Sequence, residues 1–114
     1  MKKAIYKFKA ECGRQGTLEG CFIADKKMVE VLISEKIEVY YGEVLGKHSE
    51  IYGNVEPNEL TIVTDDNSII EMFEKHQLYS GINPFDYGFI NYSNEKIDTN
   101  ECEDVYSLCE LLIK

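Results

Sequence analysis

The residues best suited to chemistry lie close together between positions 43 and 50. In this stretch a carboxylate, an amine, an imidazole, a hydroxyl and a second carboxylate follow one another, as Glu43, Lys47, His48, Ser49 and Glu50. Imidazole titrates near neutrality, and a nearby carboxylate can fix its tautomer and raise its pKa. Such a set could serve as an acid or base, or as a hydrogen-bonding contact for a ligand.

The same stretch nearly matches the P-loop pattern G-x-x-x-x-G-K-[ST], in which backbone amides cradle phosphate groups. Here Gly42, Gly46 and Lys47 stand one residue closer than the pattern requires. His48 replaces the hydroxyl residue that would bind magnesium, and Glu43 adds a negative charge where a phosphate would lie. We therefore expect no nucleotide phosphate site.

Catalysis by neighbouring residues is the second interpretation. Successive side chains of an extended segment point to opposite faces, which weakens a triad formed by His48, Ser49 and Glu50. A nucleophilic serine also requires an oxyanion hole, for which there is no signature. Metal binding has only His48 and His76 as imidazole ligands, with no spacing rule to link them. We expect no catalytic residue, metal or cofactor, and keep as an alternative a small enzyme in which Glu43 or Glu50 orients His48 as general acid or base.

Tyrosines flank the glycine-rich loop 42–53. Tyr40 and Tyr41 precede it, Tyr52 lies near its end, and the irregular segment 79–100 holds three more. Tyrosine combines a large apolar ring with a hydrogen-bonding tip and is enriched at protein interfaces. We therefore predict a contact surface at this loop for a protein or a small ligand. Its predicted binding residues are Tyr41, Glu43, Lys47, His48, Ser49, Glu50 and Tyr52.

Length and charge limit the class of protein. At 114 residues the chain can bury a core as one domain, residues 1–114, without metals or disulfides. Its formal net charge of −9 argues against direct nucleic-acid binding, which needs clustered Lys and Arg. Residues 1–15 hold five basic side chains, whereas residues 95–110 hold six acidic ones. A further alternative is therefore an acidic inhibitor that mimics nucleic acid towards a basic protein, through the acidic residues of 35–74 and 95–110.

Cysteine usage predicts an intracellular protein. No two of the four cysteines have the C-x-x-C spacing of zinc or redox sites, and the chain starts without the apolar segment of a secretory signal. No apolar run approaches the roughly eighteen residues that span a membrane. We expect reduced thiols, a cytoplasmic location and no membrane contact. The cysteines are Cys12, Cys21, Cys102 and Cys109.

Hydrophobic periodicity predicts the elements that position these residues. Strands are predicted at 4–12, 17–23, 37–44, 51–55, 60–64 and 89–92, with a glycine turn at 13–16. Helices are predicted at 25–34, 66–78 and 100–113. Asp25 should cap the first helix, and Ser68 with Glu71 should form a capping box on the second. The Asp65–Asp66 pair is expected to stabilise that helix start rather than to bind a metal.

These elements predict an α+β domain, with a mainly antiparallel sheet and about three helices packed on one face. The functional prediction is a small, acidic, non-enzymatic binding or regulatory protein that acts through the loop 42–53. Its partner would be a protein, a second copy of the chain included, or a small ligand.

Overall fold

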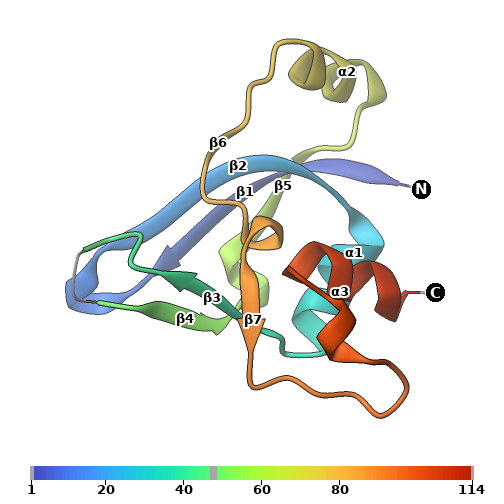
Figure 1. The fold of residues 1–114 in the computed structure, drawn as a ribbon. Helices are drawn as coiled ribbons and strands as arrows, with labels where there is room; N and C mark the ends of the chain where they lie inside the picture. Colours follow the sequence, from blue (N-terminus) through green and yellow to red (C-terminus); the bar gives the residue numbers. More distant parts are fainter. Residues whose placement is uncertain (1, 47–48, 114) are drawn as a thin grey trace.

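The structure is a computed structural model that describes residues 2–46 and 49–113. The strands are β1 (Lys3–Glu11), β2 (Thr17–Asp25), β3 (Glu38–Gly42), β4 (Ile51–Asn54), β5 (Leu60–Thr64), β6 (Ser80–Gly81) and β7 (Gly88–Ile90). The helices are α1 (Lys26–Ser34), α2 (Asn67–Lys75) and α3 (Val105–Leu112). Every strand pair among the described residues is antiparallel, and the predicted α+β class is confirmed (Figure 1).

The strands form two sheets rather than one. The larger has the order β5-β1-β2-β6, and the smaller has the order β4-β3-β7. The predicted hairpin is confirmed, because β1 and β2 pair along their whole length from Lys3 opposite Asp25 to Glu11 opposite Thr17. Gly13 (φ +63°) and Gly16 (φ +122°) supply the positive φ values of its turn. The hairpin forms the centre of the larger sheet.

Alternation along β1 separates two apolar clusters. Ala4, Tyr6 and Phe8 face the main core, which also contains buried residues of α1, α3 and β3. Ile5 faces the other way and packs with Ile70 and Phe73 of α2. We expected all helices on one face, but α2 covers the opposite face of the β1–β2 hairpin from α1 and α3 (Figure 1).

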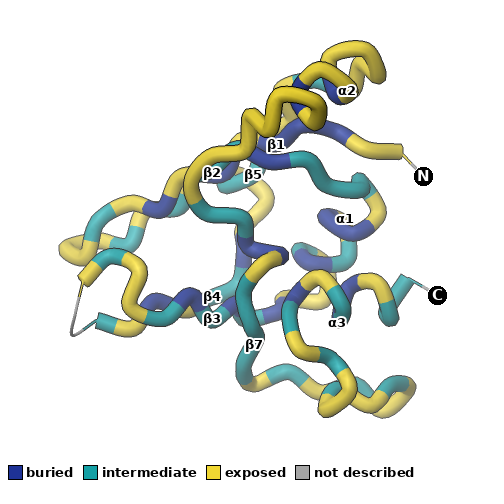
Figure 2. Tube along the Cα trace, turned by 45° about the horizontal axis from the view of Figure 1, so that its top comes forward, coloured by how far each residue is buried: buried dark blue, intermediate teal, exposed yellow. Residues whose placement is uncertain are grey.

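The helix boundaries follow their capping residues. Asp25 caps α1 as predicted and accepts a hydrogen bond from the Lys27 amide at 2.7 Å. The cap of α2 is Asp66, which accepts from the Ser68 amide at 2.9 Å, so the predicted capping box of Ser68 and Glu71 is wrong. The helix ends at Lys75 and remains mostly exposed (Figure 2).

The last helix is shorter than predicted. Asp104 and Ser107 form a capping box, so α3 begins at Val105 instead of near residue 100. Before it, Thr99–Glu101 form a separate 3₁₀ turn capped by Asp98. Cys102 therefore lies outside α3. All four cysteines are free thiols. None of the helices in the described ranges is both long and apolar enough to cross a bilayer.

A contact between two glycines fixes the short strand β6. Gly20 of β2 is opposite Gly81 of β6. A Cβ atom on Gly20 would overlap the backbone of Ile82, and one on Gly81 would overlap the carbonyl oxygen of Glu19. Gly81 also has a φ of +66°. Only glycine allows this approach, which holds the chain after α2 against the sheet.

Candidate functional site

The smaller sheet has one face in the core and one face directed outwards. On β3, Val39 and Tyr41 are buried, so the intervening side chain of Tyr40 lies on the outer face. Tyr40 is directly opposite Tyr52 of β4, which is 58% exposed. Directly opposite residues of antiparallel strands share a face. The two tyrosine side chains therefore project from the same outer face of the sheet.

Polar groups border these tyrosines. Glu38 is opposite Asn54 on β4 and opposite Ile90 on β7. The Asn91 side-chain amide donates a hydrogen bond to the Glu38 carboxylate at 3.3 Å. We refer to the outer surface made by Glu38, Tyr40, Tyr52, Asn54 and Ile90 as the tyrosine face.

Carboxylates set the electrostatics of the tyrosine face. The pKa of the Tyr40 phenol is raised, chiefly by hydrogen bonding with the Glu50 carboxylate and further by desolvation and by the charges of Glu50 and Glu43. The phenol therefore stays protonated at neutral pH and can donate a hydrogen bond. With Glu38, three carboxylates lie on or beside the tyrosine face.

The structure divides the predicted binding residues into three groups. Glu43 and Glu50 are exposed, Ser49 is half-buried, and Tyr52 is on the tyrosine face. Tyr41 is different, because it is only 7% exposed and belongs to the core. Two of the predicted residues, Lys47 and His48, lie outside the described residues.

Alternation along β3 explains why Tyr41 is buried, because it lies on the same side of the strand as Val39. Its ring stacks on Phe8 at 6.3 Å between centroids. A bulge occurs at the same place, since the register shifts between Tyr40 and Gly42, and Gly42 adopts a φ of +73°. Burial raises the pKa of the Tyr41 phenol. Its role is packing rather than contact with a ligand.

The first part of the loop rests on the neighbouring hairpin turn. Leu45 is half-buried against the main core, and its side chain lies beside Gly16 at the β1–β2 turn. The two turns lie together at one end of the molecule (Figure 1). Glu43 and Val44 stay exposed, so this contact holds the start of the loop while leaving its polar side chain open to solvent.

The other tyrosines do not extend the tyrosine face. Tyr87 meets Tyr41 edge to face at 5.2 Å, inside the core. Tyr92 donates a hydrogen bond from its hydroxyl to Glu35 at 2.7 Å, and Tyr79 packs on Phe73 beside α2. The segments around the loop and after α2 therefore meet through a buried aromatic contact.

Acidic residues elsewhere have local structural partners. Asp65 pairs with Lys26 at 2.7 Å, and this ion pair lowers the pKa of the Asp65 carboxyl. The Ser68 hydroxyl and amide lower the pKa of Asp66 in the same way. The sequence predicted that the Asp65–Asp66 pair stabilises the start of α2. This prediction is confirmed for Asp66, which is the N-cap of the helix.

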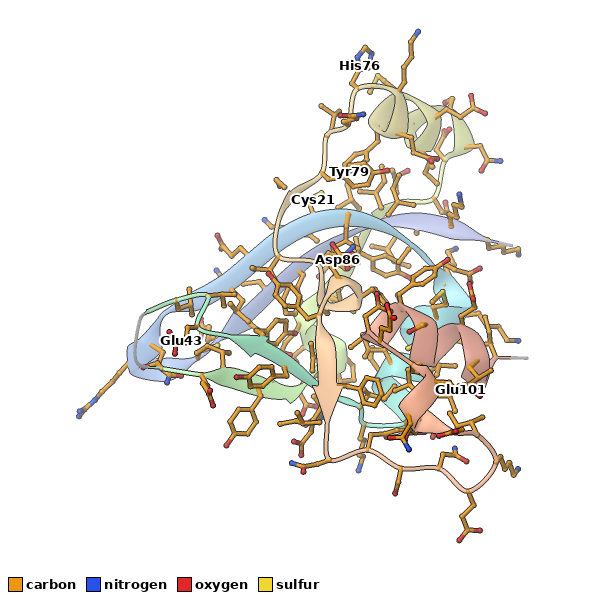
Figure 3. The ribbon with its side chains drawn as sticks, in the orientation of Figure 1. Cys21, Glu43, His76, Tyr79, Asp86 and Glu101 are labelled. Atoms are coloured by element: carbon orange, nitrogen blue, oxygen red, sulfur yellow. The ribbon has the colours of Figure 1, made fainter. Side chains whose placement is uncertain are left out.

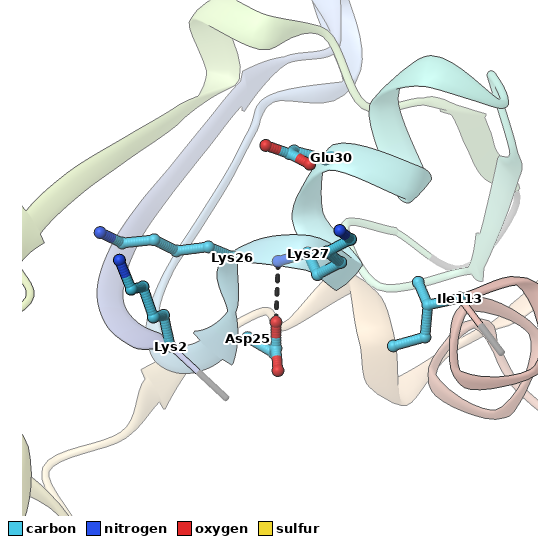
Figure 4. A pocket seen from close by; sticks show the side chains of 6 residues that line it. All are labelled: Lys2, Asp25, Lys26, Lys27, Glu30 and Ile113. Atoms are coloured by element: carbon cyan, nitrogen blue, oxygen red, sulfur yellow. Dashed lines mark hydrogen bonds between the residues drawn. The ribbon is translucent and has the colours of Figure 1, made fainter.

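In residues 2–46 and 49–113, no group of three or more His, Cys, Asp or Glu residues could hold a metal ion. His76 lies at the end of α2, on the far side of the molecule from Glu43 (Figure 3). One hollow, of about 410 Å³, borders the tyrosine face at Ile90 and Asn91, and others lie away from it. One of about 480 Å³, at the start of α1, is lined by Lys2, Asp25, Lys26, Lys27, Glu30 and Ile113 (Figure 4).

No protein-family model, curated protein or solved structure matches this chain. The function is therefore inferred from surface chemistry. One exposed and one half-buried tyrosine beside three carboxylates form a surface suited to cationic groups, because the face of an aromatic ring attracts a cation and a carboxylate pairs with it.

Proposed function

We propose that this chain is a small cytoplasmic binding protein whose tyrosine face takes a basic segment of a protein partner. The observation that carries the proposal is the cross-strand pairing of Tyr40 with Tyr52 on an outward sheet face, with Glu38 on the same face and Glu50 close to the Tyr40 phenol. A regulatory effect would follow from occupying that partner's basic segment. The four free thiols fit a reducing compartment.

Each part of the face would have its own contact. The aliphatic stem of an arginine or lysine would lie on the rings of Tyr40 and Tyr52, where apolar surface is available. Its cationic head would reach Glu50 or Glu38, and a guanidinium can bind a carboxylate through two parallel hydrogen bonds. Tyr52 is readily accessible to such a partner, since 58% of this residue is exposed to solvent.

The charge of the whole chain supports the same kind of partner. A net charge of −9 attracts basic proteins over long range and speeds their encounter. Long-range attraction alone does not choose a binding site, however. On this proposal the tyrosine face supplies the specific contact and the remaining acids supply the steering.

A titration with a defined probe tests the proposal. The probe is a short synthetic peptide of alternating arginine and glycine, added to the ¹⁵N-labelled chain at physiological salt. We expect amide shifts to concentrate on residues 38–43, 50–54 and 88–91. We expect Tyr52→Ala to weaken binding about tenfold, which corresponds to roughly 1.4 kcal/mol. Tyr106→Ala is the matched control, because Tyr106 is 49% exposed on α3.

Two outcomes would contradict the proposal. Shifts spread evenly over the acids of 95–110 as well, with equal affinity for Tyr52→Ala and the wild type, would favour the charge mimic of a nucleic acid. Shifts confined to another surface would move the binding site away from the tyrosine face altogether. Repeating the titration with His48→Ala tests separately whether the imidazole contributes.

A further inference from the structure

The strand β5 is an open edge of the larger sheet. Among the described residues it pairs with β1 on one side only, and it ends the sheet order β5-β1-β2-β6. Its sequence, Leu-Thr-Ile-Val-Thr, has no charge, proline or glycine. Three successive residues, Thr61, Ile62 and Val63, are exposed. Such an edge offers unpaired backbone groups to another strand.

An apolar groove runs along the inner side of this edge. Leu60 is opposite Phe8 and Ile62 is opposite Tyr6, so both side chains of β5 point to the side of the main core. Next to Ile62, a hollow of about 580 Å³ separates β5 from helix α1. Its apolar lining comes from Tyr6, Val29, Ile33 and Ile62. A strand added to β5 would place every second side chain over this groove.

The start of β5 is acidic. Glu56 and Glu59 directly precede the strand in the 3₁₀ turn before it. Glu56 is exposed, and Glu59 is half-buried. The lysine of β1 that follows Phe8, Lys9, lies 4.0 Å from Glu19 of β2 and so has an acidic partner of its own.

The end of β5 carries lysines. A hollow of about 300 Å³ at this end is lined by Lys2, Lys3, Lys26, Asp65 and Asn67. Asp65 pairs with Lys26 at 2.7 Å, and Asp66 accepts from Ser68 as the cap of α2. The acids of α1 line the neighbouring hollow together with a further lysine, Lys27. Lys2 and Lys3 are exposed, so they leave positive charge at this end of the strand.

We propose that β5 pairs with β5 of a second copy of this chain, antiparallel about Thr61, so that the two larger sheets join into one with four strands from each copy. Thr61 is the centre because the register with β1 shifts at Val63, which leaves Leu60–Ile62 as the regular part of the edge. Leu60 of each copy would be opposite Ile62 of the other, in an apolar row between the two grooves. The pairing would also satisfy the free backbone groups of both edges.

The distribution of charge favours a second copy as the occupant. In an antiparallel pair, the start of each strand lies beside the end of the other. A matching strand therefore needs acids before it and lysines at its end, and β5 itself meets this requirement. Glu56 and Glu59 of each copy would approach the lysine-lined hollow of the other, and such complementary charges fix the register of a contact. A segment that is basic at both ends would instead meet Lys2 and Lys3.

Sedimentation velocity at increasing protein concentration tests this proposal. We expect the wild type to form a dimer, with hydrogen exchange at Leu60–Thr64 slowing as the dimer forms. Ile62→Lys should raise the dissociation constant of the dimer at least about tenfold, because it places a charge in the apolar row. Tyr106→Lys is the matched control, since Tyr106 is 49% exposed and Ile62 is 48% exposed, but Tyr106 lies on α3.

A pair of charge reversals tests the orientation without changing the apolar row. Glu59→Lys and Lys3→Glu should each weaken the dimer, because like charges would then meet at both ends of the paired strands. A mixture of the two variants should form a heterodimer, since each acid again meets a lysine. The Glu59 carboxylate also accepts a hydrogen bond from the Glu56 amide, so recovery in the mixture decides the question rather than the loss in one variant.

Three results would overturn the proposal. They are a wild type that stays monomeric at millimolar concentration, a dimer that Ile62→Lys leaves as stable as Tyr106→Lys does, and a mixture of the two charge variants that stays monomeric. The contact uses the larger sheet, so each result is independent of the tyrosine face on the smaller sheet.

Discussion

Tyr40 of β3 is directly opposite Tyr52 of β4 on the outside of the smaller sheet, whereas Tyr41, one residue further along, is buried against Phe8. Adjacent tyrosines thus have different roles. The outward pair provides an aromatic surface bordered by carboxylates, and the inward ring joins the smaller sheet to the main core.

Stability should separate Tyr41 from Tyr52. We expect Tyr41→Ala to lower the unfolding free energy by about 3–5 kcal/mol, because it removes a buried aromatic ring. Tyr52→Ala should change it by less than about 0.5 kcal/mol, as expected for an exposed position. Urea unfolding followed by circular dichroism measures both. Equal losses for the two variants would contradict the assignment of their faces.

The close approach of β6 to β2 should depend on glycine. We expect Gly81→Ala to destabilise the fold by about 2 kcal/mol or more, because an added Cβ overlaps the Glu19 carbonyl and φ is positive there. Gly88→Ala is the control, since nothing lies within 4 Å of a Cβ at that position. Thermal unfolding of the two variants compares them. Similar midpoints would show that β6 does not need this approach.

The Cys109 thiol should make stability depend on alkaline pH. Burial raises its pKa from 9.0 to about 12. The folded state therefore holds the Cys109 proton more tightly than the unfolded chain. The contribution of this thiol to the free energy of unfolding is complete below about pH 9 and is lost as the pH rises towards 12. The loss would amount to at most about 4 kcal/mol.

Unfolding measured at successive pH values checks this expectation. The decline above pH 9 should be shallower in Cys109→Ala than in the wild type. An alkylating reagent at neutral pH should also modify Cys109 only after unfolding. Rapid modification of Cys109 in the folded protein would contradict its burial.

Asp66, rather than Ser68, should control the start of α2. Asp66→Ala removes the carboxylate that accepts from the Ser68 amide, so we expect faster hydrogen exchange along α2. Glu71→Gln should leave exchange unchanged, because Glu71 takes no part in the cap. Faster exchange in Glu71→Gln than in Asp66→Ala would restore the capping box that the sequence predicted.

Local patterns predicted most of the elements. The alternation in β1 and β2, the glycines between them and the cap at Asp25 each depend on neighbouring residues alone, and each is confirmed. The placement of α2 could not be predicted in this way. Its apolar residues show helical spacing, but only contact with Ile5 decides which face of the hairpin it covers.

At the candidate site, too, local sequence patterns predict the faces of a strand but not its pairing with other strands. Alternation along β3 indicated one polar face, and that face contains Tyr40. The same alternation places Tyr41 with Val39 on the opposite, buried face, whereas the bulge at Gly42 depends on pairing with β4. The position of Tyr40 opposite Tyr52 depends on the register between β3 and β4, which is likewise set by the pairing of the two strands.

Site-specific crosslinking in the source cell tests the central claim most directly. A photoreactive phenylalanine would replace Tyr52 in one variant and Tyr106 in the other, and mass spectrometry would identify the crosslinked segments. We predict a partner captured at position 52 and not at position 106, with the crosslink in a segment rich in arginine or lysine. Equal capture at both positions, or a segment at position 52 without basic residues, would contradict the proposed role of the tyrosine face.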